Sequence, residues 1–186
     1  DRTNWKPTFY SITDDLVLED KICEMSEICE QSEYVFLPDI HFRGKSFHSK
    51  ISNDKILWIN QKFGKGFSKD LPFVYPGGTV IYEAFQILKY LGFKKIICLG
   101  VDMNYEIHKT AEPINKKSAI EIKSKLDDDP NHFDSSYFGS GKRYHQPEKF
   151  IINNMLENLY FLYELQEELN LKIINAGYDS KLDKFK

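Results

Sequence analysis

Hydrophobic and polar positions follow two different periods along the chain. Short apolar runs rich in β-branched and aromatic residues are expected to be strands, at residues 8–13, 34–40, 55–61, 94–100 and 171–177. The run 94–100 (KKIICLG) is continuously apolar at its centre, which is typical of a strand buried on both faces of a parallel sheet. The run 34–40 is expected to stop near Pro38.

Between these runs, apolar positions recur with the helical period. Helices are expected over about 15–31, 79–91, 119–126 and 147–170. Asp14 is suited to cap the first of them, and Gly92 lies just beyond the end of the second. Alternating strands and helices indicate a three-layer, Rossmann-like α/β fold, with a mainly parallel sheet and helices on both faces.

The composition narrows the class of protein. The 186 residues are 41% hydrophobic and 28% charged, which fits one soluble α/β domain over 1–186 with a small lid. A net charge of −3 gives no electrostatic case for nucleic-acid binding. No apolar run approaches the roughly 20 residues that span a bilayer, and no signal peptide is visible. The three cysteines lack metal-ligand spacing, which favours a reducing cytoplasm.

A ligand site is expected beyond the carboxyl ends of the parallel strands, where open α/β sheets bind their ligands. The sequence YPGGTV places Gly77 and Gly78 just before a helix, so that backbone N–H groups could approach an anion at the helix N-terminus. Thr79 would cap this helix or bond a phosphate. A plain turn followed by an N-cap is the alternative.

The sequence GVDMNY, at the end of the predicted strand 94–100, is a second candidate. Asp102 could bind a ribose hydroxyl, a sugar or a metal, or could close the strand with an Asx-turn. Tyr105 could hydrogen-bond a phosphate leaving group, or be a half-buried core tyrosine. Asn104 lies between them and belongs to the same candidate set for donor binding.

Residues 131–146 (NHFDSSYFGSGKRYHQ) have no hydrophobic period and carry many reactive side chains. Their two glycines suggest a mobile loop that could close over a site as a lid. His132 and His145 are candidate general bases, because histidine titrates near neutrality. Lys142 and Arg143 could neutralise a phosphate. A solvated basic turn is the alternative.

Other clusters carry weaker signals. The three acidic residues 127–129 lack the spacing of a cation site and are more typical of a solvated acidic turn. No Cys–His pairing indicates zinc, and no GxSxG or Walker-type motif is present. No bound metal is therefore expected.

The stretch GGTVIYEAFQILKYLGFKKIICLGVDMNY resembles the central motif of the MptE-like domain family: a Gly-rich turn, a helix, LGF/Y-K-x-I, an apolar strand and G-V/I-D. Bacterial CMP-sialic acid transferases carry a similar stretch. The segment NHFDSSYFGSGKRYHQP resembles surface-polysaccharide proteins of the MptE-like group. Together with NWKPTFYSITDDLV, the resemblance covers most of the chain. It specifies fold more than activity, because the group includes both glycosyltransferases and a pterin diphosphokinase.

The resemblance implies three roles. In the sialyltransferases, a histidine ahead of the penultimate helix–strand pair is the general base on the acceptor hydroxyl. His145 lies at the matching distance from the last strand, and His132 is the second candidate. Tyrosines after the G-I-D turn help the CMP phosphate to leave, and Tyr105 is the nearest match. The residues of the Gly-rich turn contact the donor, and here they are Gly77, Gly78 and Thr79.

The chain departs from the family at its beginning. Such proteins start with a strand and a GNGPSL-like loop that cradles the nucleotide phosphate, and this sequence starts where the second or third strand of the family would. We therefore expect the chain to lack that N-terminal strand and phosphate-binding loop.

These observations favour a glycosyltransferase-like enzyme that transfers an acidic sugar from a CMP-sugar donor to a hydroxyl of a surface glycan, with inversion and without a metal. His145 would deprotonate the acceptor, while Tyr105 and Arg143 would stabilise the departing phosphate. The expected partners are a nucleotide-sugar and a glycan acceptor, with no further cofactor. The sequence is compatible with a cytoplasmic location, with peripheral association at the inner face of the membrane, and with an oligomer.

Two alternatives stay open. An MptE-like diphosphokinase would transfer diphosphate from ATP to a pterin-type alcohol, and would need Mg²⁺ held by carboxylates such as Asp14, Asp15 and Asp102. A non-catalytic binding module that lacks the nucleotide loop is the other alternative.

Overall fold

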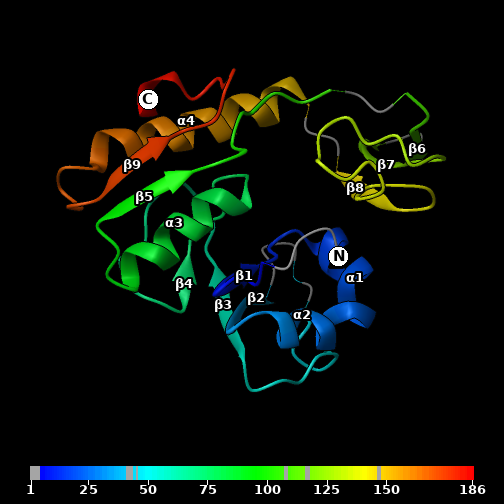
Figure 1. The fold of residues 1–186 in the computed structure, drawn as a ribbon, viewed down its shortest axis with the longest axis horizontal. Helices are drawn as coiled ribbons and strands as arrows, with labels where there is room; N and C mark the ends of the chain where they lie inside the picture. The colour runs from blue at the N-terminus through cyan, green and yellow to red at the C-terminus, as the bar shows by residue number, and fades with distance from the viewer. Residues whose placement is uncertain (1–4, 41–43, 45, 107–108, 116–117, 146–147) are drawn as a thin grey trace. The chain divides into compact units, whose positions relative to one another are not determined.

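The structure is a computed structural model that describes residues 5–40, 44, 46–106, 109–115, 118–145 and 148–186. The chain forms two compact units, Asp1–Gly92 and Phe93–Lys186 (Figure 1). None of the described helices is both long enough and apolar enough to cross a membrane.

The first unit is built on a four-stranded parallel sheet. Its strands lie in the order β1-β2-β3-β4 and are β1 (Phe9–Ser11), β2 (Tyr34–Ile40), β3 (Ile56–Gln61) and β4 (Phe73–Val74). The strands expected at 8–13, 34–40 and 55–61 are therefore confirmed. β2 does not stop near Pro38 as expected but continues to Ile40, and the pairing register with β3 shifts between these two residues. A bulge at this point accommodates a proline within a strand.

Helices cover both faces of this sheet. α1 (Asp15–Lys21), the 3₁₀ turn η1 (Ile22–Glu24) and α2 (Met25–Gln31) follow β1, and α3 (Val80–Tyr90) follows β4 (Figure 1). Val35 and Leu37 of β2 pack in one core cluster with residues of α1 and α2, whereas Phe36 packs in a second cluster with Ile87 of α3. Because successive strand side chains point to opposite faces, these clusters lie on either side of the sheet. The α/β fold expected from the sequence is confirmed in this unit.

Polar side chains fix the ends of the helices in the first unit. The Asp14 carboxylate accepts hydrogen bonds from the backbone N–H groups of Leu16 and Val17, at 2.9 and 3.1 Å, and so caps α1 as expected. The Nζ atom of Lys55 donates to the carbonyls of Cys29 and Ser32, at 2.6 and 2.9 Å. A lysine just before β3 therefore satisfies carbonyls at the C-terminus of α2.

Gln86 fastens the segment before α3 to the helix itself. Its side chain is 1% exposed and accepts from the N–H groups of Ser68 and Tyr75, both at 2.9 Å. Its amide nitrogen donates to the carbonyls of Tyr75 and Tyr82, at 2.8 and 3.0 Å. This buried amide therefore replaces regular strand pairing along an otherwise irregular stretch.

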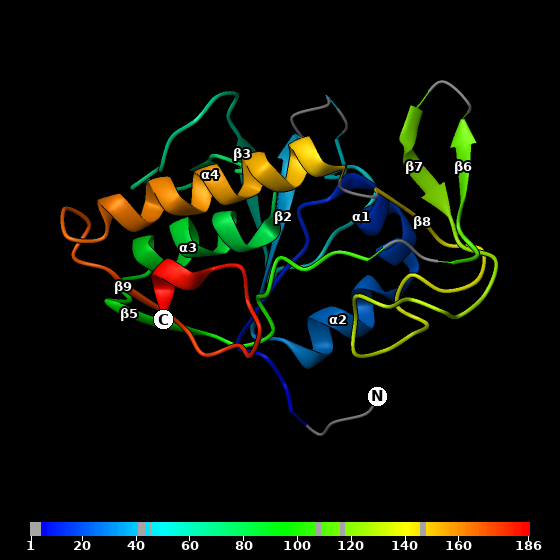
Figure 2. The same cartoon turned by 90° about the horizontal axis from the view of Figure 1, so that it is seen from above.

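The second unit combines a parallel pair with an antiparallel sheet. β5 (Lys95–Cys98) pairs with β9 (Lys172–Asn175), and α4 (Lys149–Leu165) lies between them in the sequence. The antiparallel sheet has the order β6-β7-β8, from β6 (Glu112–Asn115), β7 (Ser118–Lys123) and β8 (Arg143–His145) (Figure 2). The 3₁₀ turn η2 (Asp183–Phe185) follows β9.

Two expectations for the second unit were wrong. The helix expected at 119–126 is strand β7 for most of its length, because its apolar and charged residues alternate with a period of two: Ile122 is buried and Lys123 is exposed. β5 is not buried on both faces, since Ile97 is 57% exposed while Cys98 is buried. The expected helix 147–170 is confirmed as α4, with Pro147 outside the described residues.

Candidate functional site

The carboxyl edge of the first sheet carries a part-buried polar pair that sequence reasoning missed. Gln61, the last residue of β3, donates through Nε2 to Glu83 Oε1 at 2.9 Å and to the carbonyl of Thr13 at 3.5 Å. Thr13 follows β1, and Glu83 lies in the first turn of α3. The contacts therefore join the ends of β1 and β3 to the beginning of α3, where a parallel sheet presents its ligand-binding edge.

Glu83 is almost wholly buried, with 1% of its surface exposed. Burial raises the pKa of its carboxyl to about 8, and hydrogen bonds from Gln61 and Thr13 oppose this only in part. Glu83 therefore holds its proton at neutral pH. Its Oε2 atom has no hydrogen-bond partner among the described residues. The sequence offered a signal for this residue, because position 83 precedes the apolar position Ile87 by four and so falls on the predicted buried face of the helix.

The Gly-rich turn stands where the sequence placed it, directly before α3. Gly77 and Gly78 have φ angles of 57° and 82°, in the left-handed region that favours glycine. A Cβ atom on Gly77 would overlap the ring of Tyr82. Thr79 is the N-cap of α3, and its Oγ1 accepts from the N–H of Ile81 at 3.4 Å. Capping is thus the observed role of Thr79, whose own N–H donates to the carbonyl of Pro76 at 3.2 Å.

The turn after β5 is held by hydrogen bonds within the turn and by bonds to the segment that follows β9. Asp102 accepts from the N–H of Asn104 at 2.9 Å, which is the Asx-turn named above as the structural alternative. The Asn104 side chain donates to the carbonyl of Asp179 at 2.5 Å. The Tyr105 hydroxyl lies 3.8 Å from the sulfur atoms of Met103 and Met155, and burial raises its pKa. Sulfur is a weak acceptor, so this hydroxyl keeps most of its capacity to donate to a ligand.

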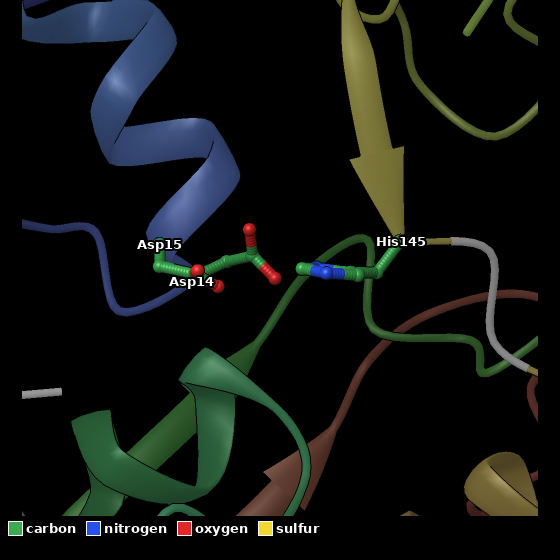
Figure 3. Close-up of side chains that lie close together, drawn as sticks. All are labelled: Asp14, Asp15 and His145. Atoms are coloured by element: carbon green, nitrogen blue, oxygen red, sulfur yellow. The ribbon is translucent and has the colours of Figure 1, made fainter. Parts of the chain in front are cut away.

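Arg143 and His145 lie on a strand and not in an irregular loop. They flank the buried Tyr144 on β8, and alternation along the strand places both on the face opposite to it. Arg143 contacts Glu121 of β7 at 3.4 Å, so part of its charge is already balanced. Figure 3 shows His145 at the end of β8, and it shows Asp14 and Asp15 where α1 begins.

His132 is held in place by a buried carboxylate. Its Nδ1 lies 2.8 Å from Asp129 Oδ2, and the Asp129 side chain is fully buried while that of His132 is 39% exposed. The expectation that residues 127–129 form a solvated acidic turn is therefore wrong for Asp129. Its carboxylate also accepts from the N–H groups of Asn131 and Phe138, at 2.8 and 3.2 Å.

The other two aspartates of this run also organise the segment. Asp128 accepts from the backbone N–H and the hydroxyl of Thr110 and from the hydroxyl of Ser124. Asp127 accepts from the N–H of Ser140 at 2.8 Å. The segment expected to be a mobile lid at 131–146, of which Gln146 lies outside the described residues, is thus tied to the preceding turn by its own hydrogen bonds.

Comparisons with known proteins add no further constraint. The chain gives no significant match to a protein-family model, to a curated protein or to a solved structure. The function is therefore argued from the residues and their geometry.

Proposed function

We propose that the chain is a glycosyltransferase-like enzyme that transfers an acidic sugar from a CMP-sugar to a hydroxyl of a surface glycan. The observation that carries the proposal is the turn Gly77–Thr79, at the start of α3 on the ligand-binding edge of a parallel sheet. Backbone N–H groups in such a turn, together with the helix dipole, favour a bound phosphate.

Glu83 does not repel an anion bound at this turn, although it is an acidic residue. A carboxylate in the first turn of α3 would repel a phosphate, but burial keeps Glu83 protonated at neutral pH. The helix N-terminus therefore keeps its positive potential. The neutral carboxyl also leaves an oxygen without a partner among the described residues. Glu83 therefore adds no negative charge next to a phosphate bound at this turn.

The remaining roles are proposed residue by residue. In the second unit, the Tyr105 hydroxyl is available to donate to a ligand, because its present partners are two weakly accepting sulfur atoms. Arg143 supplies positive charge, and Asp102 and Asn104 shape the turn that carries Tyr105. A histidine, His145 or His132, takes the proton of the acceptor hydroxyl. Transfer then proceeds in one displacement, with inversion at the anomeric carbon.

Calorimetry with CMP and with ATP tests the donor. We expect CMP to bind and Gly77→Ala to weaken it about tenfold or more, because alanine strains the left-handed backbone and its Cβ overlaps Tyr82. Gly64→Ala is the matched control, since Gly64 also has a positive φ of 95° but has open space around its Cβ position. A well-folded chain that binds neither nucleotide would refute the proposal.

Release of CMP from CMP-N-acetylneuraminic acid then tests the reaction. We expect turnover to persist in the presence of a chelator such as EDTA, because the proposed mechanism stabilises the leaving phosphate with hydrogen bonds and an arginine. Binding of ATP in place of CMP, together with a chelator-sensitive activity, would favour diphosphate transfer instead.

A further inference from the structure

The antiparallel sheet of the second unit places two positive charges directly opposite each other (Figure 2). The pairing register of β7 and β8 sets Lys123 beside Arg143, and both side chains are exposed, while their neighbours Ile122 and Tyr144 are buried on the other face. Like charges at directly opposed positions of an antiparallel pair destabilise the sheet. The register therefore has an electrostatic cost that a bound anion would relieve.

The charge of Lys123 is not balanced by the neighbouring glutamates. Glu112 of β6 faces Lys123 in the pairing register, but its Oε1 is ion-paired with Lys125 Nζ at 2.5 Å. Glu121 is paired with Arg143 at 3.4 Å. Within the part of the chain that the structure describes, the ammonium group of Lys123 makes neither an ion pair nor a hydrogen bond. It therefore keeps its full capacity to bind an anion.

Lys123 and Lys125 line an open groove beside β6 and β7. The volume of the groove is about 530 Å³, within the range of about 300–1,000 Å³ that is typical of small-molecule sites. All of its lining residues belong to the second unit. Because Lys125 and Glu112 neutralise each other, the excess charge of the lining side chains is the single positive charge of Lys123.

The other walls of the groove fit a sugar ring. Ile114 is 44% exposed and offers an apolar surface to the C–H face of a ring. Ser140 donates its hydroxyl to the carbonyl of Lys125 at 2.9 Å, so the lone pairs of Oγ are available to accept from a ligand hydroxyl. An ammonium group without a partner, an apolar wall and an acceptor oxygen together match a hydroxylated ring that carries one negative charge.

We propose that this groove binds a carboxylate-bearing sugar, such as a uronic acid residue of a glycan. The carboxylate pairs with Lys123, one face of the ring packs on Ile114, and a ring hydroxyl donates to Ser140 Oγ. A carboxylate fits the single excess charge better than a phosphate monoester, which carries nearly two negative charges at neutral pH. The site lies wholly in the second unit, and it does not depend on the proposed transfer.

Two-dimensional NMR of the full chain labelled with ¹⁵N measures binding directly, with D-glucuronate as the probe. We expect glucuronate to shift the backbone amide signals of Lys123, Ser140 and Gly141 and to saturate at millimolar concentrations. Glucose has a similar ring without the carboxylate, and acetate has a carboxylate without the ring. Each should bind at least about fivefold more weakly than glucuronate. Glucose or acetate binding as tightly as glucuronate would overturn the proposal.

Substitutions then locate the site. Lys123→Gln removes the charge at an exposed position and should weaken glucuronate binding about fivefold or more. Lys172→Gln is the matched control, because Lys172 is also exposed and also faces a lysine in its register, Lys95, but does not line the groove. Ile114→Ser should weaken glucuronate binding and leave acetate binding unchanged. Equal losses in Lys123→Gln and Lys172→Gln, or no loss in either, would refute the site.

This inference and the proposed function can fail independently, because glucuronate and CMP are measured as separate ligands. A chain that binds glucuronate through Lys123 but does not bind CMP retains this site and refutes the proposed transfer. A chain that binds CMP and releases it from the donor, but shows no amide shifts with glucuronate, refutes this inference alone.

Discussion

The Gln61 amide donates to the buried carboxyl of Glu83 at 2.9 Å, across 22 positions of sequence. This contact links α3 to the carboxyl edge of the first sheet, where the same amide nitrogen also reaches the carbonyl of Thr13 at 3.5 Å. Because burial raises the pKa of Glu83 to about 8, this pair is mainly uncharged at neutral pH.

The pH dependence of stability should reveal the proton on Glu83. Its pKa is raised from 4.5 to about 8, so between these values the folded chain holds a proton that the unfolded chain releases. The stability that the protonated Glu83 carboxyl gives to the folded chain is fully present below the unfolded pKa, and it is lost as the pH rises through the folded pKa. We expect the free energy of unfolding of the wild type, relative to Glu83→Gln, to fall by about 1.4 kcal/mol per pH unit within this window.

Urea denaturation at several pH values between about 5 and 8 measures this difference, since other titrating groups affect both proteins equally. Glu27→Gln is the control, because Glu27 is exposed on α2 and contacts only Gln31 among the bonds described. A constant difference between wild type and Glu83→Gln across the range would show that Glu83 titrates normally.

Removing the partner of Glu83 should be costly. Gln61→Leu leaves Glu83 Oε1 without its donor, and a buried polar group without a partner costs about 1–3 kcal/mol. In a double-mutant cycle, Gln61→Leu and Glu83→Leu together should cost less than the sum of the single changes. Additive costs would mean that the 2.9 Å contact contributes nothing in solution.

Gln86 should be essential to the stability of the first unit. Gln86→Met keeps the volume but leaves three backbone groups of Ser68 and Tyr75 without their partner, so we expect a loss of at least about 2 kcal/mol. Gln31→Met, at an exposed contact on α2, should change stability by less than about 0.5 kcal/mol. Equal effects in urea denaturation would contradict this account.

Removing the hydroxyl of Tyr105 should lower activity while leaving stability almost unchanged. Its hydroxyl contacts only two thioether sulfurs in the bonds described, so Tyr105→Phe should change the free energy of unfolding by less than about 0.5 kcal/mol. If the hydroxyl donates to the departing phosphate, turnover should fall roughly tenfold to a hundredfold. Tyr90→Phe, at an exposed position of α3, is the matched control. An unchanged rate in Tyr105→Phe would remove this residue from the mechanism.

The sequence predicted the parallel part of the fold better than the antiparallel part. The strands β1, β2, β3, β5 and β9 and the helices α3 and α4 follow from periodicity. The strand β7 was mistaken for a helix because six residues are too few to separate the two periods, and its partner β8 contributes only three residues. The isolated pattern of a short strand carries little information until its neighbours are known.

Only those parts of the candidate site that are formed by residues adjacent in the sequence could be predicted. The turn at Gly77 and the cap at Thr79 are encoded by adjacent residues, and so is the Asx-turn of Asp102. The pairing of Gln61 with Glu83 is a tertiary contact that no local pattern specifies. Asp129 lies three residues from His132, yet a run of three aspartates resembles solvated surface until the backbone folds over one of them.

The ammonium group of Lys55 donates to the carbonyls of Cys29 and Ser32 at the end of α2. It thus satisfies the C-terminus of a helix although Lys55 lies 26 residues from Cys29 in the sequence. Acylation of this lysine would remove two of its three donors together with the positive charge that these carbonyls attract. A single modification on the segment before β3 would therefore loosen α2, and with it the apolar layer that Met25 and Cys29 form on one face of the sheet.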